Sequence, residues 1–173
     1  MEKAIIAYEN FYKKAIPFLI AIPLIIMTVV IVINTLGRKL LVPFPVTVEL
    51  VEALLVVSVY FGVSMVAMER GHVNVTFLTE NWSKKSRCVI DLFGNLLASA
   101  AFGYLTLSAW SLAFESVRIL EFRLAVYNFP LWPFKCLFAL GILLLFVQLL
   151  INSIKSAYLL AGRETYAGQS FEA

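Results

Sequence analysis

The chain has 173 residues, of which 61% are hydrophobic and 14% are charged, and its formal net charge is +3. About a quarter of the residues of a soluble domain are charged, so this composition argues against a soluble enzyme and against a nucleic-acid-binding protein. It indicates a membrane protein, in which the positions of the basic residues matter more than their sum.

Four apolar segments predict membrane-spanning helices. The first, residues 15–37, is a charge-free run of 23 residues, which at about 1.5 Å per residue crosses a hydrocarbon core of roughly 30 Å. Basic residues follow it directly, so we expect an uncleaved helix and not a signal peptide. The other spans are expected at about residues 48–68, 92–114 and 136–154. The sequence therefore predicts an all-α integral membrane protein with a single domain over residues 1–173.

Two acidic residues stand at the start of the second expected span. Glu49 and Glu52 are three residues apart, so they share one face of a helix near its end. The carboxylates could pair with Arg38 or Lys39, which follow the first span, or they could form a site that docks a partner or attracts an ion. We favour the structural pairing.

The connection between the second and third spans predicts a short interfacial amphipathic helix at about residues 74–83. Val75, Leu78 and Trp82 recur at i, i+3 and i+7, which places them on one helical face that can lie against the membrane surface. A solvated loop is the alternative interpretation. We favour the helix because of the periodicity.

His72 is the only histidine of the chain, and it stands two residues after Arg70. Two axial imidazoles need two histidines, so bis-histidine haem ligation is excluded. A lone histidine at a helix boundary more often caps backbone groups or lies among headgroups than acts as a pH switch or ligand. We therefore expect Arg70, His72 and Trp82 near one membrane surface, without a chemical role.

A charged stripe follows the third span. Glu115, Arg118 and Glu121 recur every three residues, which predicts that the helix continues out of the membrane for about two turns and forms i, i+3 ion pairs. Pro130 then stops any helix, and Trp132 suits the aromatic belt at a membrane surface. We expect a projecting helical ledge and a tight turn before the fourth span.

The expected spans lack the residue patterns that are typical of a catalytic or transport site. None contains an ionisable residue in its middle, where such a residue would mark a transport or proton path. Their polar side chains are expected to hydrogen-bond between helices, and Ser99 and Gly103 form a small-residue seam for close packing. These polar residues are Asn34, Ser58, Ser64, Asn95, Ser99, Thr106, Ser108, Ser111 and Gln148. With no catalytic pair, phosphate loop or metal-ligand spacing, no catalytic, substrate-binding, cofactor or metal residue is expected, and the chain looks like a scaffold or accessory subunit.

The basic residues predict the orientation. Nine lie in the N-terminal segment, the connection between spans two and three and the C-terminal segment, against five in the other two connections. Because basic residues in short loops resist translocation, both termini are expected in the cytoplasm.

Several short motifs give the chain a resemblance to the DctQ-like small membrane subunit of tripartite ATP-independent periplasmic (TRAP) transporters, over nearly its whole length. The matching motifs are Arg38, Glu49-x-x-Glu52, Gly62, Arg70-Gly71-His72-Val73-Asn74-Val75-x-x-Leu78, Pro130-x-Trp132, Gly141 and Gln148. One departure is Asn74, where family members often have aspartate; asparagine also caps a helix.

The resemblance implies a role in the bacterial inner membrane. A large DctM-like membrane subunit would carry the sodium and substrate sites, and a periplasmic binding protein would deliver an organic acid of the dicarboxylate or sialic-acid type. The small subunit would brace the large one among membrane lipids, with Glu49, Glu52, Arg118, Glu121 and Trp132 near the periplasmic surface. The competing class is an autonomous four-helix, proton-coupled transporter of the small multidrug type, for which Glu52 is the nearest candidate carboxylate.

Overall fold

Four long helices and a small hairpin make up the described chain. The computed structural model describes residues 2–40, 46–68, 84–123 and 128–160. In chain order the elements are α1 (Glu2–Leu40), α2 (Thr47–Met68), α4 (Lys84–Arg118), β1 (Phe122–Arg123), β2 (Phe129–Pro130) and α5 (Trp132–Leu160). All four helices are long and apolar enough to cross a membrane, which confirms the expected all-α membrane fold. The interfacial helix expected at about residues 74–83 lies outside the described residues.

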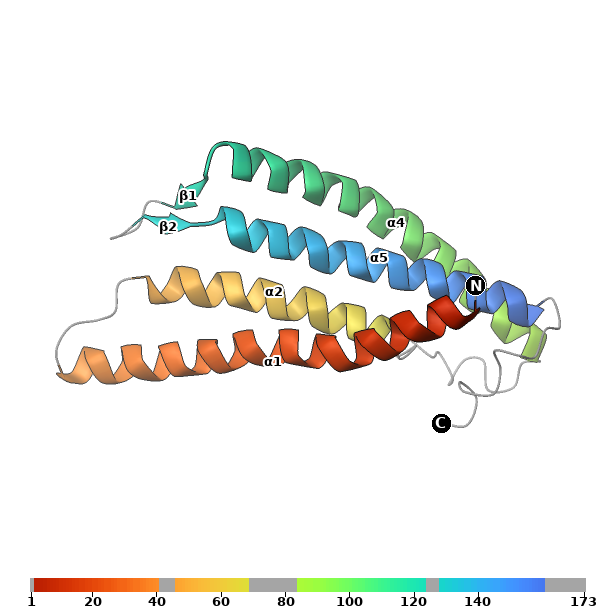
Figure 1. The fold of residues 1–173 in the computed structure, drawn as a ribbon, viewed down its shortest axis with the longest axis horizontal. Helices are drawn as coiled ribbons and strands as arrows, with labels where there is room; N and C mark the ends of the chain where they lie inside the picture. The colour runs from red at the N-terminus through yellow and green to blue at the C-terminus, as the bar shows by residue number, and fades with distance from the viewer. Residues whose placement is uncertain (1, 41–45, 69–83, 124–127, 161–173) are drawn as a thin grey trace.

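The helices lie side by side in a row, except that the start of α1 crosses in front of α2 toward α5. α4 packs on α5, α5 on α2 and α2 on α1, and Figure 1 shows this order from one edge of the row to the other. The β1–β2 pair marks one end of the row, called here the hairpin end. The start of α1 and the end of α5 lie together at the opposite end, called the termini end.

The inner and outer helices of the row differ in burial. About 39% of the apolar span of α2 and 33% of that of α5 are buried, against 22% for α4 and 11% for α1. A helix at the edge of a row packs along most of its length on one neighbour, so most of its surface is left for lipid or another protein. The row therefore encloses little interior.

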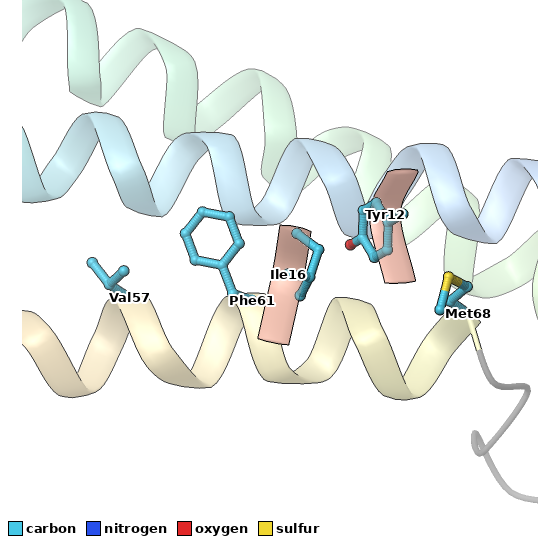
Figure 2. Packing of buried hydrophobic residues seen from close by; sticks show 5 residues of the cluster. All are labelled: Tyr12, Ile16, Val57, Phe61 and Met68. Atoms are coloured by element: carbon cyan, nitrogen blue, oxygen red, sulfur yellow. The ribbon is translucent and has the colours of Figure 1, made fainter. Parts of the chain in front are cut away.

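α1 meets its neighbours through a narrow stripe. Near the termini end, Tyr12 and Ile16 are buried against Val57, Phe61 and Met68 of α2, as Figure 2 shows. Farther along, the positions that are not exposed recur every three or four residues. They are Ile20, Pro23, Met27, Val30, Asn34 and Gly37. This spacing is the seam of two helices that pack side by side at a small angle.

Small residues let α5 approach α4 and α2 closely. Ala109 and Ala113 of α4 are buried together with Ala139 and Ile142 of α5. A Cβ atom at Gly103, part of the small-residue seam predicted from the sequence, would stand 3.0 Å from the Phe146 ring of α5. A Cβ at Gly141 of α5 would stand equally close to Tyr60 of α2. Without a hydrophobic drive between helices in lipid, such close contacts are a main source of association.

α4 ends in a Schellman motif whose left-handed position is a leucine. The Glu121 amide donates to the Ser116 carbonyl (2.9 Å) and the Leu120 amide to the Val117 carbonyl (3.2 Å), the two bonds of that motif. Leu120 has a φ of 47°, a conformation that glycine adopts at little cost and other residues do not. The expected helical ledge through Glu121 is therefore wrong, because the chain turns at Leu120 and enters β1.

The strain at Leu120 predicts that Leu120→Gly raises the free energy of unfolding by about 1 kcal/mol, since glycine removes the steric cost of the left-handed backbone. Leu120 is 63% exposed, so little packing is lost. The measurement is thermal or denaturant unfolding in mild detergent. Ile119→Gly is the matched control, because Ile119 is equally exposed and its φ is not positive. Equal effects of the two substitutions would contradict the prediction.

Candidate partner-contact surfaces

Two ion pairs join the elements of the hairpin end. Lys135 Nζ of α5 pairs with the Glu121 carboxylate just before β1. Arg123 Nη1 of β1 pairs with Glu52 Oε2 of α2 at 2.8 Å. The two bonds tie the hairpin to both inner helices of the row.

The hairpin itself is short and anchored by an aromatic contact. β1 and β2 run antiparallel, with Phe122 opposite Pro130 and Arg123 opposite Phe129. The Phe129 ring is buried and stacks on Phe134 of α5, with centroids 5.4 Å apart. The Leu131 amide also donates to the Glu121 carbonyl at 3.0 Å. These contacts place Arg123 within reach of α2.

Both ion-pair expectations for this region were wrong. Glu52 pairs with Arg123 and not with Arg38 or Lys39, because the hairpin brings Arg123 within reach of the start of α2. Glu121 pairs with Lys135 and not along a helical stripe with Arg118, because Glu121 lies beyond the end of α4. Arg123 and Lys135 are thus site residues that the sequence analysis did not single out.

The environment of Glu121 favours its charged form. The hydrogen bond from the Lys135 ammonium lowers the pKa of this carboxyl below its usual 4.5, and the nearby Ser116 side chain lowers it further. Both Lys135 and Glu121 are partly shielded from solvent. The pair therefore persists below the pH at which an ordinary glutamate carboxyl protonates.

The candidate residues expected from the sequence divide into two groups. Six lie at the hairpin end: Arg38 in the last turn of α1, Glu49 and Glu52 near the start of α2, Arg118 at the end of α4, Glu121 before β1 and Trp132 at the start of α5. All are exposed except Glu49 and Glu121, which are half-buried. Arg70, His72 and Trp82 lie outside the described residues, so their expected positions stay predictions.

A second set of polar ties holds the termini end. Tyr12 of α1 donates to Ser64 Oγ of α2, and Asn152 Nδ2 of α5 donates to the Ala67 carbonyl of α2 at 2.7 Å. Lys155 of α5 pairs with Glu9 of α1. The sequence analysis missed Glu9, Tyr12 and Asn152, although the i, i+4 spacing of Gln148 and Asn152 on an apolar helix was a signal for a buried polar pair.

Most polar side chains of the spans bond within their own helix. Ser58, Ser99 and Thr106 each donate to a carbonyl three or four residues earlier, and Ser111 does the same. The expectation of bonds between helices was therefore wrong for these residues. A hydroxyl in an apolar helix can always reach its own backbone, whereas a partner on another helix must be placed by packing.

The outer helices leave wide apolar faces uncovered. On α1, Phe18, Ile25 and Ile33 are among the large apolar side chains that are more than half exposed, and on α4 Tyr104, Leu107 and Phe114 are. In a membrane these faces meet lipid or another membrane protein. The hairpin end, by contrast, presents charged and aromatic groups suited to the membrane surface.

Residues 27–158 match the protein family described as tripartite ATP-independent periplasmic transporters, DctQ component. The chain belongs to the DctQ family. It is therefore the small membrane subunit of a TRAP transporter, and the family places it in the inner membrane. The match includes the six candidate residues at the hairpin end of this DctQ-family chain, whereas Glu9 and Tyr12 precede it. No curated protein matches the chain.

The lowered pKa of Glu121 predicts an acid-dependent stability. A carboxyl whose pKa is depressed on folding contributes stability that is complete above its usual 4.5 and is lost as the pH falls through the lowered pKa. Glu121→Gln should therefore lower the melting temperature near neutral pH, and the difference from the unsubstituted chain should disappear once the pH has fallen through the lowered pKa.

The measurement is a melting curve in mild detergent at several pH values. Glu115→Gln is the matched control, because Glu115 is an exposed carboxylate at the same end. A pH-independent difference for Glu121→Gln would show that the side chain stabilises the hairpin without its charge.

Proposed function

We propose that this chain braces a large DctM-like subunit during sodium-coupled uptake of an organic acid. The observation that carries the proposal is the row of helices, whose two edge helices leave most of their apolar surface uncovered. A chain with this shape offers broad faces to a neighbour in the bilayer but no enclosed path for a solute. The sodium and substrate sites are assigned to the large subunit, and no cofactor or catalytic step to this chain.

The distribution of charge supports the same assignment. The ion pairs of the described residues stand at the two ends of the row, Glu52–Arg123 and Glu121–Lys135 at one end and Glu9–Lys155 at the other. Proton or ion coupling within a membrane needs ionisable groups at depth. Glu52 is 59% exposed at the hairpin end, which disfavours a proton-coupled transporter of the small multidrug type.

The proposal also covers the orientation of the chain in the membrane and its contact with the periplasmic binding protein. We place both termini in the cytoplasm because nine basic residues lie on that side against five on the other. The hairpin end then faces the periplasm, where Arg118, Trp132 and the exposed Glu52–Arg123 pair can contribute to contact with the binding protein. The cargo is proposed to be an organic acid of the dicarboxylate or sialic-acid type.

Purification in mild detergent tests the accessory role. A much larger multi-pass membrane protein is expected to copurify in equal amount, and liposomes that contain this chain alone should show no uptake of an organic acid or of an organic cation. The control is the same liposome with both proteins, which should take up the acid when sodium and the binding protein are present. Solute flux through the chain alone would contradict the proposal.

Cysteine labelling in intact cells tests the orientation. In a background with Cys88 and Cys136 changed to serine, Arg118→Cys should react with a membrane-impermeant maleimide added outside, and Lys13→Cys should react only after the cells are opened. Both positions are exposed and lie at opposite ends of the row. Labelling of Lys13→Cys from outside, with Arg118→Cys protected, would reverse the topology.

A further inference from the structure

An apolar groove of about 380 Å³ opens on the helix row at the hairpin end. All of its lining residues except one are apolar or aromatic, and they come from three helices and the residue before α5. They are Ala53, Val56 and Tyr60 of α2, Leu112 of α4, and Leu131, Phe134, Lys135 and Phe138. A second hollow of about 180 Å³ shares Tyr60, Leu112 and Phe138 with the first. The two form one track that leads from the helix ends toward the middle of the row.

The arrangement of the helices explains the groove. α2 and α4 lie on either side of α5 (Figure 1). Toward the termini end they close over α5, where Leu145 and Leu149 are buried with Ala67 of α2 and Phe102 of α4 packs against them. At the hairpin end they stay apart. The Tyr60 and Phe138 rings, in edge contact with centroids 4.6 Å apart, then form part of the wall.

The groove needs an apolar occupant. Its lining residues on α2, α4 and α5 belong to the membrane-spanning parts of these helices, so the groove opens to hydrocarbon and not to water. An apolar hollow does not hold ordered water, and an empty one loses the dispersion contacts that filling would supply. Lipid or a neighbouring protein must therefore fill it.

The size of the groove favours a lipid chain over a helix. A 10 Å length of α-helix, about 10 Å across, occupies roughly 800 Å³, about twice the volume of the main hollow. An acyl chain is thin and flexible, and it can follow the narrower track past Leu112 into the second hollow. A hollow of this volume lies within the range of roughly 300–1,000 Å³ that encloses small ligands.

Lys135 gives the groove a charged end. Its ammonium carries three donors, one of which goes to Glu121, so donors are left for a second acceptor. The side chain lines the groove in the first turn of α5, close to Trp132 and hence at the depth of the headgroups. An anionic phosphate is the headgroup part that a lysine at this depth attracts.

We propose that this groove binds one phospholipid of the leaflet at the hairpin end, with an acyl chain between α2 and α4 and the phosphate at Lys135 Nζ. The bound lipid completes the row where α2 and α4 stay apart. The proposal does not depend on the large subunit, because every group that it uses belongs to this chain.

Native mass spectrometry of the full chain tests the proposal. The chain is released from its own membrane in mild detergent with any subunit that accompanies it, and the phospholipid retained on the chain is counted. Leu112→Trp fills the groove and should reduce retained phospholipid by roughly fivefold. Leu107→Trp, on the same helix at a 74% exposed position outside the groove lining, should leave it unchanged.

A second pair of variants separates the phosphate contact from the ion pair. Lys135→Gln removes both and should also lower retention roughly fivefold. Glu121→Gln removes the ion pair but leaves the ammonium, so retention should be equal or higher. Equal loss in both variants would overturn the phosphate contact, because it would trace the effect to the hairpin anchor.

Photo-crosslinking identifies the occupant directly. A benzophenone amino acid in place of Val56, inside the groove, should capture a phospholipid that digestion and mass spectrometry detect as an adduct on the α2 peptide. An adduct with a polypeptide and none with lipid would overturn the proposal, as would retention of phospholipid at full level in Leu112→Trp. Failure to copurify a large subunit would instead contradict the proposed function. The measurements of bound phospholipid would still test the groove.

Discussion

α5 is the element on which the whole row depends. It packs against α2 on one side and α4 on the other, and it receives ties along its entire length: Lys135 near its start, Gly141 and Phe146 in the middle, Asn152 and Lys155 near its end. In lipid, helices associate through close packing and polar contacts and not through the hydrophobic effect. α5 carries small residues toward both neighbours, Gly141 against α2 and Ala139 against α4, and its polar anchors reach α2, α1 and the residue before β1.

Among the described residues, the ion pairs between elements gather at the two ends of the row, and close packing of small residues joins the helices between them. This division follows from the solvent, because ion pairs near a membrane surface avoid the cost of charge in hydrocarbon. It affects α1 most. Tyr12 and Glu9 fix its first turns to α2 and α5, whereas beyond Ile20 only about one residue in each turn meets a neighbour. The apolar span of α1 is the least buried of the four, so this outer part is the part best able to adapt to a protein beside it.

The sequence predicted the spans because composition alone decides them: long charge-free runs have few other structures open to them in a bilayer. It predicted the contact of Gly103 for a similar reason, since small residues at helical spacing imply close packing. Prediction from the sequence failed where segments that are far apart in the chain meet in the fold. Glu52 and Arg123 are 71 residues apart, and no local pattern pairs them. The three-residue spacing up to Glu121 looked helical, and the turn was hidden because a leucine, not a glycine, holds the left-handed position.

The arrangement of the helices in a row accounts for both the proposed bracing of the large subunit and the proposed lipid groove. A compact four-helix bundle would bury most of its apolar surface and leave a neighbour little to hold. The row does the opposite: each helix shows two faces to its surroundings, and α2 and α4 do not meet at the hairpin end. On the proposed function, the missing contacts come from outside the chain, through the large subunit along the edges and phospholipid between α2 and α4. The ion pairs of the hairpin end hold the hairpin against α2 and α5, so they shape the surface that the partner meets.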